Sequence, residues 1–248
     1  NINSIIILVL KMNNEPKISL ILPVYNECYN LKENFPKIYS YLKKFGNFEI
    51  IIAEDGSVDC TKRVAERYSR LNNVILISKK ERMGKGGAIK NGFKIARGQI
   101  IGFIDIDLAV PLKHIDEAIS LIKSGKKFVI ASRYIKGADA DRNKKRLFMS
   151  IMFNLLIRVL FNTKVKDHQC GFKFIDRDLA KKLAKIVKDN SWFFDAEMII
   201  RAERLGIMPY EMPVEWHERR ETKLKRLDIL YFLRSALKLK LDLIKSKS

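Results

Sequence analysis

Two carboxylates follow a short apolar run near the middle of the chain. Residues 100–104 are isoleucine, phenylalanine or glycine, and Asp105 and Asp107 come directly after them. If this run is a buried strand, alternate residues share a face, so the two carboxylates can converge where the strand ends. Oxygen ligands of this kind suit Mg²⁺ or Mn²⁺, and such ions usually complete their shell with phosphate oxygens. The pair therefore indicates a divalent-metal site, unless the two aspartates cap the next helix or pair with surface lysines.

Three other segments carry residue types that suit a nucleotide. Pro23 would end the pairing of a first strand, and Tyr25, close to Glu27, could stack on a base. Asp55 follows a second apolar run, where a carboxylate can accept the imide N–H of a uracil or the N1–H of a guanine. We expect the segment that begins at Asp55 to form a turn and a helix N-cap as well. Lys85 begins a glycine-containing helix start, which offers free N–H groups and a cation to phosphates.

Two common nucleotide-binding signatures do not match the glycine-rich segment. The Rossmann spacing needs glycines at 84, 86 and 89, and the residue at the last of these positions is Ile89. The phosphate loop of nucleotide hydrolases needs Gly-Lys followed by Ser or Thr, and the chain has Gly-Lys-Gly there. These mismatches argue against a dinucleotide oxidoreductase and against a P-loop hydrolase.

The elements that must position these residues alternate along the first half of the chain. We expect strands at Ile18–Val24, Phe48–Ala53, Val74–Ser78, Ile100–Ile104 and Phe128–Ala131, and a loop with a strand at Asp167–Ile175. We expect helices at Leu31–Lys44, Thr61–Arg70, Gly87–Ala96, Leu112–Lys123 and Trp192–Leu205. This alternation predicts an α/β fold with a doubly wound, mainly parallel sheet. Ligands bind such sheets beyond the carboxyl ends of the strands, where the polar segments described above lie.

Two strongly apolar segments in the second half have polar residues set into them. Residues 147–161 are apolar apart from Ser150, Asn154 and Arg158. From Lys223 to the end of the sequence there are eight basic and two acidic residues, and leucines recur along an expected helix from Leu224 to Ile244. Basic amphipathic helices of this kind can lie in a bilayer interface. We therefore expect both segments to contact an anionic membrane surface, or otherwise to pack against the sheet.

Composition limits the class of function. The 248 residues are 47% hydrophobic and 31% charged, which suits one large folded domain. The 48 Lys and Arg against 28 Asp and Glu give a net charge of +20. Such a surface favours nucleic acid, anionic lipid or phosphorylated substrates, although a solvated lysine-rich surface alone would have the same charge. A nucleic-acid-binding protein would leave the carboxylates at the strand ends unexplained, so we expect no nucleic-acid partner.

The cysteines and the first residues argue against other classes. Cys28, Cys60 and Cys170 are scattered and show no spacing typical of a zinc or redox centre, so we expect reduced cytoplasmic thiols. The run Ile5–Leu10 is too short to span a bilayer, and no stretch of about 20 apolar residues occurs. We therefore expect no transmembrane helix. Met12 is a candidate start, because the sequence begins with Asn.

Seven motifs occur in an order that is typical of one enzyme family. They are PVYNE, EDGSVDCT, RMGKGGAIKNG, FIDIDLA, ASRY, DHQCGFKFI and WFFDAEM. In this set the chain resembles the inverting family-2 glycosyltransferases of GT-A fold, most of all the dolichyl-phosphate sugar synthases and among them the glucosyl branch. The resemblance implies a Rossmann-like doubly wound sheet with C-terminal amphipathic helices. It implies an N-terminal extension at 1–16, a GT-A domain at 17–223 and a basic helix at 224–248.

The resemblance also implies roles for residues at matching positions. The donor-binding residues would be Pro23, Tyr25, Glu27, Asp55, Lys85, Asp105 and Asp107. Asp105 and Asp107 would hold the ribose, the metal ion and the diphosphate. The residues that would bind the acceptor phosphate or the donor diphosphate are Arg133, Arg146, Arg219, Arg220 and Lys223. Each of these arginines could instead form a surface ion pair or a membrane contact.

Three further positions bear on the catalytic step. By the same resemblance, Asp195 and Glu197 would orient the donor sugar or the nucleophile, with capping of a helix start as the alternative. Mannosyl relatives often carry Gln where this chain has Ala109, so a third protein ligand to the metal is missing at that position. This departure argues against a mannosyl assignment.

The implied reaction is the transfer of a hexose from a nucleotide-sugar to dolichyl or polyprenyl phosphate, with inversion. A UDP-sugar is favoured over GDP-mannose, Mg²⁺ or Mn²⁺ would assist, and the protein would lie peripherally on the cytoplasmic face of a membrane. A family-2 transferase that acts on a polysaccharide or a soluble acceptor is the alternative. The choice among glucose, N-acetylglucosamine and mannose depends on a few pocket contacts that the sequence does not identify.

Overall fold

The computed structural model describes residues 16–141, 144–218 and 226–245, with backbone only at 144–146 and 226–229. The expected N-terminal extension lies almost wholly outside these ranges, and residues 219–225 lie outside them as well. Arg219, Arg220 and Lys223 therefore have no structural account, and Arg146 is placed only by the backbone of its helix.

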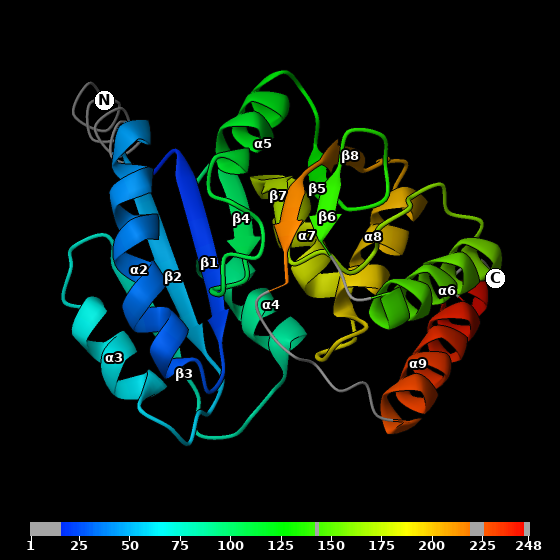
Figure 1. Cartoon of the computed structure of the whole chain (residues 1–248), viewed down its shortest axis with the longest axis horizontal. Helices are drawn as coiled ribbons and strands as arrows, with labels where there is room; N and C mark the ends of the chain where they lie inside the picture. Colours follow the sequence, from blue (N-terminus) through cyan, green and yellow to red (C-terminus); the bar gives the residue numbers. More distant parts are fainter. Residues whose placement is uncertain (1–15, 142–143, 219–225, 246–248) are drawn as a thin grey trace, which may run out of the picture.

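A seven-stranded sheet forms the centre of the molecule, in the order β3-β2-β1-β4-β7-β5-β8 (Figure 1). Its strands are β1 (Ile18–Val24), β2 (Phe48–Glu54), β3 (Val74–Ser78), β4 (Ile100–Ile104), β5 (Phe128–Ser132), β7 (Phe172–Asp176) and β8 (Tyr210–Pro213). All neighbours pair in parallel except β7, which runs antiparallel between β4 and β5. The prediction of an α/β fold with a mainly parallel sheet is confirmed. A separate parallel pair is formed by β6 (Asp139–Asp141) and β9 (Glu215–His217).

Helices cover both faces of the sheet. They are α2 (Cys28–Leu42), α3 (Thr61–Tyr68), α4 (Lys85–Ile95), α5 (His114–Lys123), α7 (Arg177–Ile186) and α8 (Phe194–Arg204), with a short 3₁₀ helix at Lys43–Phe45. In β1, Leu20 and Leu22 join the apolar cluster that includes α2, α3 and α5, whereas Ile21 joins the cluster that includes α4, α7 and α8. Because both faces are buried, the strand is apolar at every position except the buried Ser19, as expected of a parallel sheet.

Two further helices, α6 (Lys144–Phe161) and α9 (Arg226–Lys245), lie side by side at one end of the molecule, away from the sheet (Figure 1). They share a third buried cluster with α8 and the residues just before it, which includes Ile157, Phe193, Ile200 and Leu239. Each helix therefore packs on the domain, but along a strip of its surface only. None of the helices in the described part of the chain is both long enough and apolar enough to cross a bilayer.

One disulfide corrects an expectation from the sequence. Cys28 and Cys60 are joined by a disulfide, with their Cα atoms 5.3 Å apart, so the prediction of reduced thiols is wrong for these two residues. Cys170 is a free, buried cysteine. The pairing could not be read from the sequence because the two residues are 32 positions apart and only the fold brings their helix starts together.

Candidate active site

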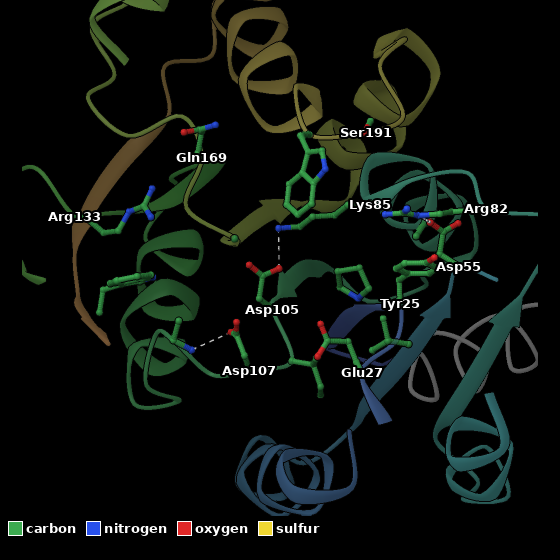
Figure 2. A pocket seen from close by; sticks show the side chains of 18 residues that line it. Tyr25, Glu27, Asp55, Arg82, Lys85, Asp105, Asp107, Arg133, Gln169 and Ser191 are labelled. Atoms are coloured by element: carbon green, nitrogen blue, oxygen red, sulfur yellow. Dashed lines mark hydrogen bonds and ion pairs between the residues drawn. The ribbon is translucent and has the colours of Figure 1, made fainter. Parts of the chain in front are cut away.

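A cavity of about 320 Å³ lies beyond the carboxyl ends of β1, β2 and β4 (Figure 2). In the sheet order, β1 lies between β2 and β4, so the cavity is at the point where the order of the strands reverses. Doubly wound sheets bind ligands at this point. The predicted site residues that line the cavity are Pro23, Tyr25, Glu27, Asp55, Lys85, Asp105, Asp107 and Arg133.

Asp55 and Arg82 organise one side of the cavity. Each oxygen of the buried Asp55 carboxylate accepts a backbone N–H, from Met83 at 2.7 Å and from Gly84 at 2.8 Å. The Arg82 guanidinium lies 3.8 Å from the centre of the Tyr25 ring and 3.9 Å from Asp55. Asp55 therefore fixes the approach to the N-terminus of α4. Any contact of Asp55 with a base would have to use the lone pairs that these two bonds leave.

A row of alternating charges leads from the core to the mouth of the cavity. Lys173, on β7, is fully buried, and its Nζ donates to Asp195 Oδ1 and to the Cys170 carbonyl oxygen, both at 2.6 Å. Asp195 Oδ2 lies 4.0 Å from Lys85 Nζ, which lies 2.7 Å from Asp105 Oδ1. Asp195 is thus held between two lysines, and Lys85 is held between two aspartates.

These charges keep Lys85 protonated. Burial by itself lowers the pKa of Lys85, but the carboxylates of Asp105 and Asp195 outweigh burial, so the pKa lies above its ordinary value. A permanent positive charge at the N-terminus of α4 is suited to an anionic phosphate.

The two aspartates of the predicted metal pair both face the cavity from the loop after β4 (Figure 2). The backbone N–H of Asp105 donates to the Gly171 carbonyl at 3.0 Å, and a Cβ at Gly171 would lie 2.0 Å from Asp105 Oδ2. Only glycine therefore allows this position of Asp105. Asp107 Oδ1 accepts the backbone N–H of Ala109 at 3.2 Å, which holds the loop in a tight turn.

The donor set suits a metal ion that is shared with a substrate. Within 16–141, 144–218 and 226–245, no three His, Cys, Asp or Glu side chains gather in a way that would hold a metal. Asp105 and Asp107 could supply part of an oxygen shell, and Mg²⁺ characteristically takes the rest from phosphates and water. The two residues fit an ion that binds together with a diphosphate.

Arg133 lies at the other end of the cavity and is already paired. Its Nε and Nη2 donate to the buried Asp167 carboxylate at 2.7 and 2.8 Å, and its backbone N–H donates to the same group at 3.0 Å. Burial by itself would raise the pKa of Asp167, but Arg133 lowers it to about 2. The guanidinium also lies 5.6 Å from the centres of the Tyr134 and Trp216 rings. This pairing fixes Arg133 at the cavity wall and leaves it fewer donors for a phosphate.

The structure separates the two carboxylates that the WFFDAEM motif contributes. Asp195 belongs to the row of charges, whereas Glu197 does not line this cavity. Glu197 accepts the backbone N–H groups of Lys188 and Asp189 at 3.0 and 2.8 Å, and Arg201 Nε at 2.6 Å. Glu197 therefore stabilises the loop before α8, which is close to the capping role given above as its alternative. It does not face the cavity in which a donor sugar would bind.

The α6 helix is hydrogen-bonded to residues that are adjacent in the chain to the wall of the cavity. Ser150 Oγ accepts the Tyr134 hydroxyl at 2.6 Å, and Asn154 Oδ1 lies 2.9 Å from both the backbone nitrogen and Nδ1 of His168. His168 is buried, and burial lowers its pKa to about 4. Two polar residues of the apolar segment 147–161 thus attach α6 to the segments that carry the cavity residues Arg133 and Gln169.

Five polar or aromatic residues that line the cavity were not predicted as site residues: Arg82, Gln169, Ser191, Trp192 and Trp216. Gln169 belongs to the motif DHQCGFKFI, Trp192 begins WFFDAEM and Arg82 begins RMGKGGAIKNG, so the motifs could have identified these three residues as part of the site. Trp192 is 57% exposed although it lines the cavity, which leaves its indole open to a bound molecule. Nothing in the spacing around Trp216 indicated that β9 reaches this site.

A doubly wound sheet with an acidic pair and a partly buried lysine at the reversal of strand order is typical of a nucleotide-dependent transferase of GT-A type. The family model for glycosyl transferase family 2 matches residues 19–184. The chain therefore belongs to glycosyl transferase family 2.

Curated relatives agree with this assignment. The chain is 35% identical to the glycosyltransferase AglD of Haloferax volcanii over 84% of its own length, but spans only 34% of that protein. It is 32% identical to the dolichyl-phosphate beta-glucosyltransferase ALG5A of Trichomonas vaginalis, with 92% of this chain and 72% of that protein covered. A third relative, the dolichyl-phosphate beta-glucosyltransferase of Saccharomyces cerevisiae, is 31% identical over 81% of this chain and 67% of its own length.

The fold also matches solved structures. Glucosyl-3-phosphoglycerate synthase from Mycobacterium tuberculosis, in complex with Mn²⁺, UDP-glucose and phosphoglyceric acid, superposes with a TM-score of 0.65 at 17% identity. The match covers 92% of this chain and 81% of that one. The same enzyme with Mn²⁺, UDP and glucosyl-3-phosphoglycerate gives a TM-score of 0.62 at 18% identity over 94% and 81% of the two chains. These matches confirm the GT-A fold.

Proposed function

We propose that this chain transfers a hexose, with glucose as the first candidate, from a nucleotide-sugar to dolichyl or a related polyprenyl phosphate. One observation carries the proposal: next to the cavity that holds the acidic pair and Lys85, Tyr134 and His168, the chain neighbours of two lining residues, are hydrogen-bonded to a helix with an exposed apolar surface. A nucleotide-sugar site next to an apolar surface suits a substrate with a phosphate head and a lipid tail. Relatives named dolichyl-phosphate beta-glucosyltransferase support this choice of acceptor.

The donor half of the reaction uses the row of charges. Lys85 would offset the negative charge that grows on the departing nucleoside diphosphate, in a cavity where charges are poorly screened. A divalent ion, Mg²⁺ or Mn²⁺, held by Asp105 and Asp107 would add further positive charge at the same place. Asp195 would hold Lys85 in position, because one oxygen of Asp195 is fixed by Lys173.

The acceptor half needs little help with deprotonation. A phosphate monoester is already an anion near neutral pH, so its oxygen can attack the anomeric carbon directly, with inversion. Arg133, fixed by Asp167, and the open indole of Trp192 are the groups we assign to orienting the acceptor phosphate and the sugar. No carboxylate base is required, which agrees with the pairing of Asp195 to two lysines.

We propose that α6 and α9 rest on the cytoplasmic leaflet of a membrane. The large apolar side chains that these helices leave exposed are Phe148, Ile151, Met152, Leu155, Leu156, Val159, Leu230, Leu233, Leu237, Leu241 and Ile244. A contiguous apolar surface of this kind typically marks an interaction site, and the basic residues of α9 suit anionic lipid. We further propose a UDP-sugar as the donor in preference to GDP-mannose.

One experiment tests the reaction and the donor together. Purified protein is incubated with polyprenyl phosphate, Mn²⁺ or Mg²⁺, and each labelled nucleotide-sugar in turn. We expect label from UDP-glucose to enter the organic phase and to be released by mild acid. Transfer only to a water-soluble acceptor, with no label in lipid from any donor, would contradict the proposal and favour the alternative acceptor class.

A further inference from the structure

One half of the cavity, which we call the nucleoside half because it contains the expected donor-binding residues Tyr25, Glu27 and Asp55, is built from two segments that touch each other. One follows β1 and contains Tyr25 and Glu27, and the other follows β2 and begins at Asp55. Four hydrogen bonds join the segments: Asn26 N to Ser57 Oγ at 3.0 Å, Val58 N to Asn26 Oδ1 at 2.9 Å, Glu27 N to Thr61 Oγ1 at 2.7 Å and Cys28 N to Asp59 Oδ2 at 3.2 Å. The shape of this half of the cavity therefore depends on how the two segments are held together.

Two of these four bonds are individually weak restraints. The two bonds that Asn26 makes, to the Ser57 hydroxyl and from the backbone N–H of Val58, are exposed to solvent, so water competes for them. Asn26 also has a positive φ of 54°, a conformation that costs free energy unless the surroundings enforce it. Hydrogen bonds alone would leave the position of Tyr25 and Glu27 sensitive to local opening.

A covalent bond joins the same two segments. Cys28 is the first residue of α2 and directly follows Glu27, and Cys60 directly precedes α3. The Cα separation of 5.3 Å is normal for a disulfide, so the backbone already holds the two residues at bonding distance. Cys28 is buried, and the disulfide closes a segment that contains all of β2 and Asp55.

We propose that Cys28 and Cys60 are an oxidation site whose disulfide presets the nucleoside half of the cavity for the donor. In the oxidised protein, the two segments form one rigid unit, and a nucleoside diphosphate binds without first ordering them. A dithiol reductant supplies two electrons and two protons, which break the S–S bond and leave two cysteine thiols while the reductant becomes a disulfide. The reduced segments then rely on the hydrogen bonds and on the packing of α2 against α3, and binding of the donor has to order them further.

The proposal rests on the proposed function only in taking a nucleoside diphosphate as the ligand. The effect is confined to one half of the cavity, because neither the disulfide nor the four hydrogen bonds between the two segments involve Arg133, Gln169 or Trp216 at the opposite wall. Reduction should therefore weaken binding of UDP and raise the KM for the donor, with little change in the KM for the acceptor phosphate.

The first experiment counts thiols. Protein purified without reductant is unfolded and alkylated, and the number of alkylated cysteines is determined from its mass by mass spectrometry. We expect one alkylated cysteine, Cys170, which the structure leaves free, and three after treatment with a dithiol. Three alkylated cysteines without reductant would overturn the proposal.

The second experiment measures UDP binding by calorimetry in Mn²⁺ buffer, for oxidised protein, reduced protein and a Cys28→Ser, Cys60→Ser double variant. We expect the Kd to rise by about three- to tenfold on reduction and in the variant, as a loss of preorganisation predicts. The dithiol should have no effect on the double variant, which is the matched control. A Kd that stays within twofold on reduction would overturn the proposal.

Hydrogen–deuterium exchange separates this proposal from the proposed function. We expect reduction to speed exchange in peptides that cover 23–28 and 55–61, with or without UDP. Unchanged exchange there would overturn the proposal even if UDP binds. If neither state binds any nucleoside diphosphate, the proposed function fails, and the exchange data alone then decide whether the disulfide orders this half of the cavity.

Discussion

Replacement of Lys173 tests whether the buried row of charges holds the site together. Lys173 is 0% exposed, and its ammonium is bonded to Asp195 and to the Cys170 carbonyl, both at 2.6 Å. In Lys173→Met, a side chain of similar volume fills the same space without the charge. Asp195 then loses its nearer cation and keeps only Lys85, at 4.0 Å.

The expected cost follows from these contacts. Removal of one partner of a buried ion pair costs about 3–5 kcal/mol, because the other charge stays buried and uncompensated. Lys85 offsets part of this cost, while the carbonyl that loses its donor adds about 1 kcal/mol. We therefore expect Lys173→Met to lower the free energy of unfolding by about 3–4 kcal/mol. Removal of both charges in Lys173→Met/Asp195→Asn should cost less than the sum of the single variants, by about 2 kcal/mol.

Urea unfolding followed by circular dichroism measures these free energies, provided that the slope with denaturant stays constant. Lys188→Met is the matched control, since it removes a lysine from an ion pair with Asp242 at the surface. The control should cost less than about 1 kcal/mol. If Lys173→Met costs no more than the control, or if the double variant shows additive costs, the row of charges does not act as described.

Four more results are expected. Asp107→Ala should lower turnover of labelled donor by about a hundredfold or more while the circular dichroism spectrum and thermal midpoint stay unchanged. Removal of divalent metal with EDTA should weaken UDP binding in calorimetry, because the ion and the diphosphate share one site. His168 has a folded pKa of about 4 against 6.5 when unfolded, so the stability it contributes is complete above pH 6.5 and is lost as pH falls toward 4, by up to about 3 kcal/mol in urea unfolding at successive pH values. Val159→Glu with Leu237→Glu should abolish sedimentation with anionic vesicles and leave UDP binding intact, because these side chains are 76% and 59% exposed.

The first half of the fold could be predicted because local patterns determine it. The runs at Ile18–Val24, Val74–Ser78 and Ile100–Ile104 coincide with strands in the structure, and the other two strands differ from prediction by one residue at the end. Because parallel strands end at the same edge of a sheet, the side chains that follow them had to meet there. This explains why Tyr25, Asp55 and Asp105 line one cavity.

The second half could not be predicted in the same way, because it depends on contacts between distant segments. The pattern expected no helix at Arg177–Ile186 and no strand at Tyr210–Pro213, and it gave no sign that β7 inserts antiparallel between β4 and β5. That insertion brings Lys173 beside Asp195 in the core. A lysine in the sequence is ordinarily taken as a surface residue, since Lys is almost never fully buried unless paired.

Helix geometry explains why two neighbouring carboxylates have different roles. Asp195 and Glu197 are two positions apart in α8, and each residue turns the helix by about 100°, so their side chains point to nearly opposite sides. Asp195 faces the row of charges and Glu197 faces the loop before the helix. The motif identified the segment correctly, but only the placement of the helix decides which carboxylate reaches the cavity.

Charge balance links the parts of the cavity to the order in which it should fill. Arg133 is compensated by Asp167 and Lys173 by Asp195, while Lys85 is divided between Asp105 and Asp195. A nucleoside diphosphate that entered alone would therefore bring its negative charge next to Asp107 and an only partly neutralised Asp105, and like charges repel strongly in a poorly screened site. Asp105 and Asp107 would hold a divalent cation whose charge would offset this repulsion, and Lys85 would then be available to the phosphates. We therefore expect the same carboxylates that would resist an unaccompanied donor to favour a donor bound to a metal ion.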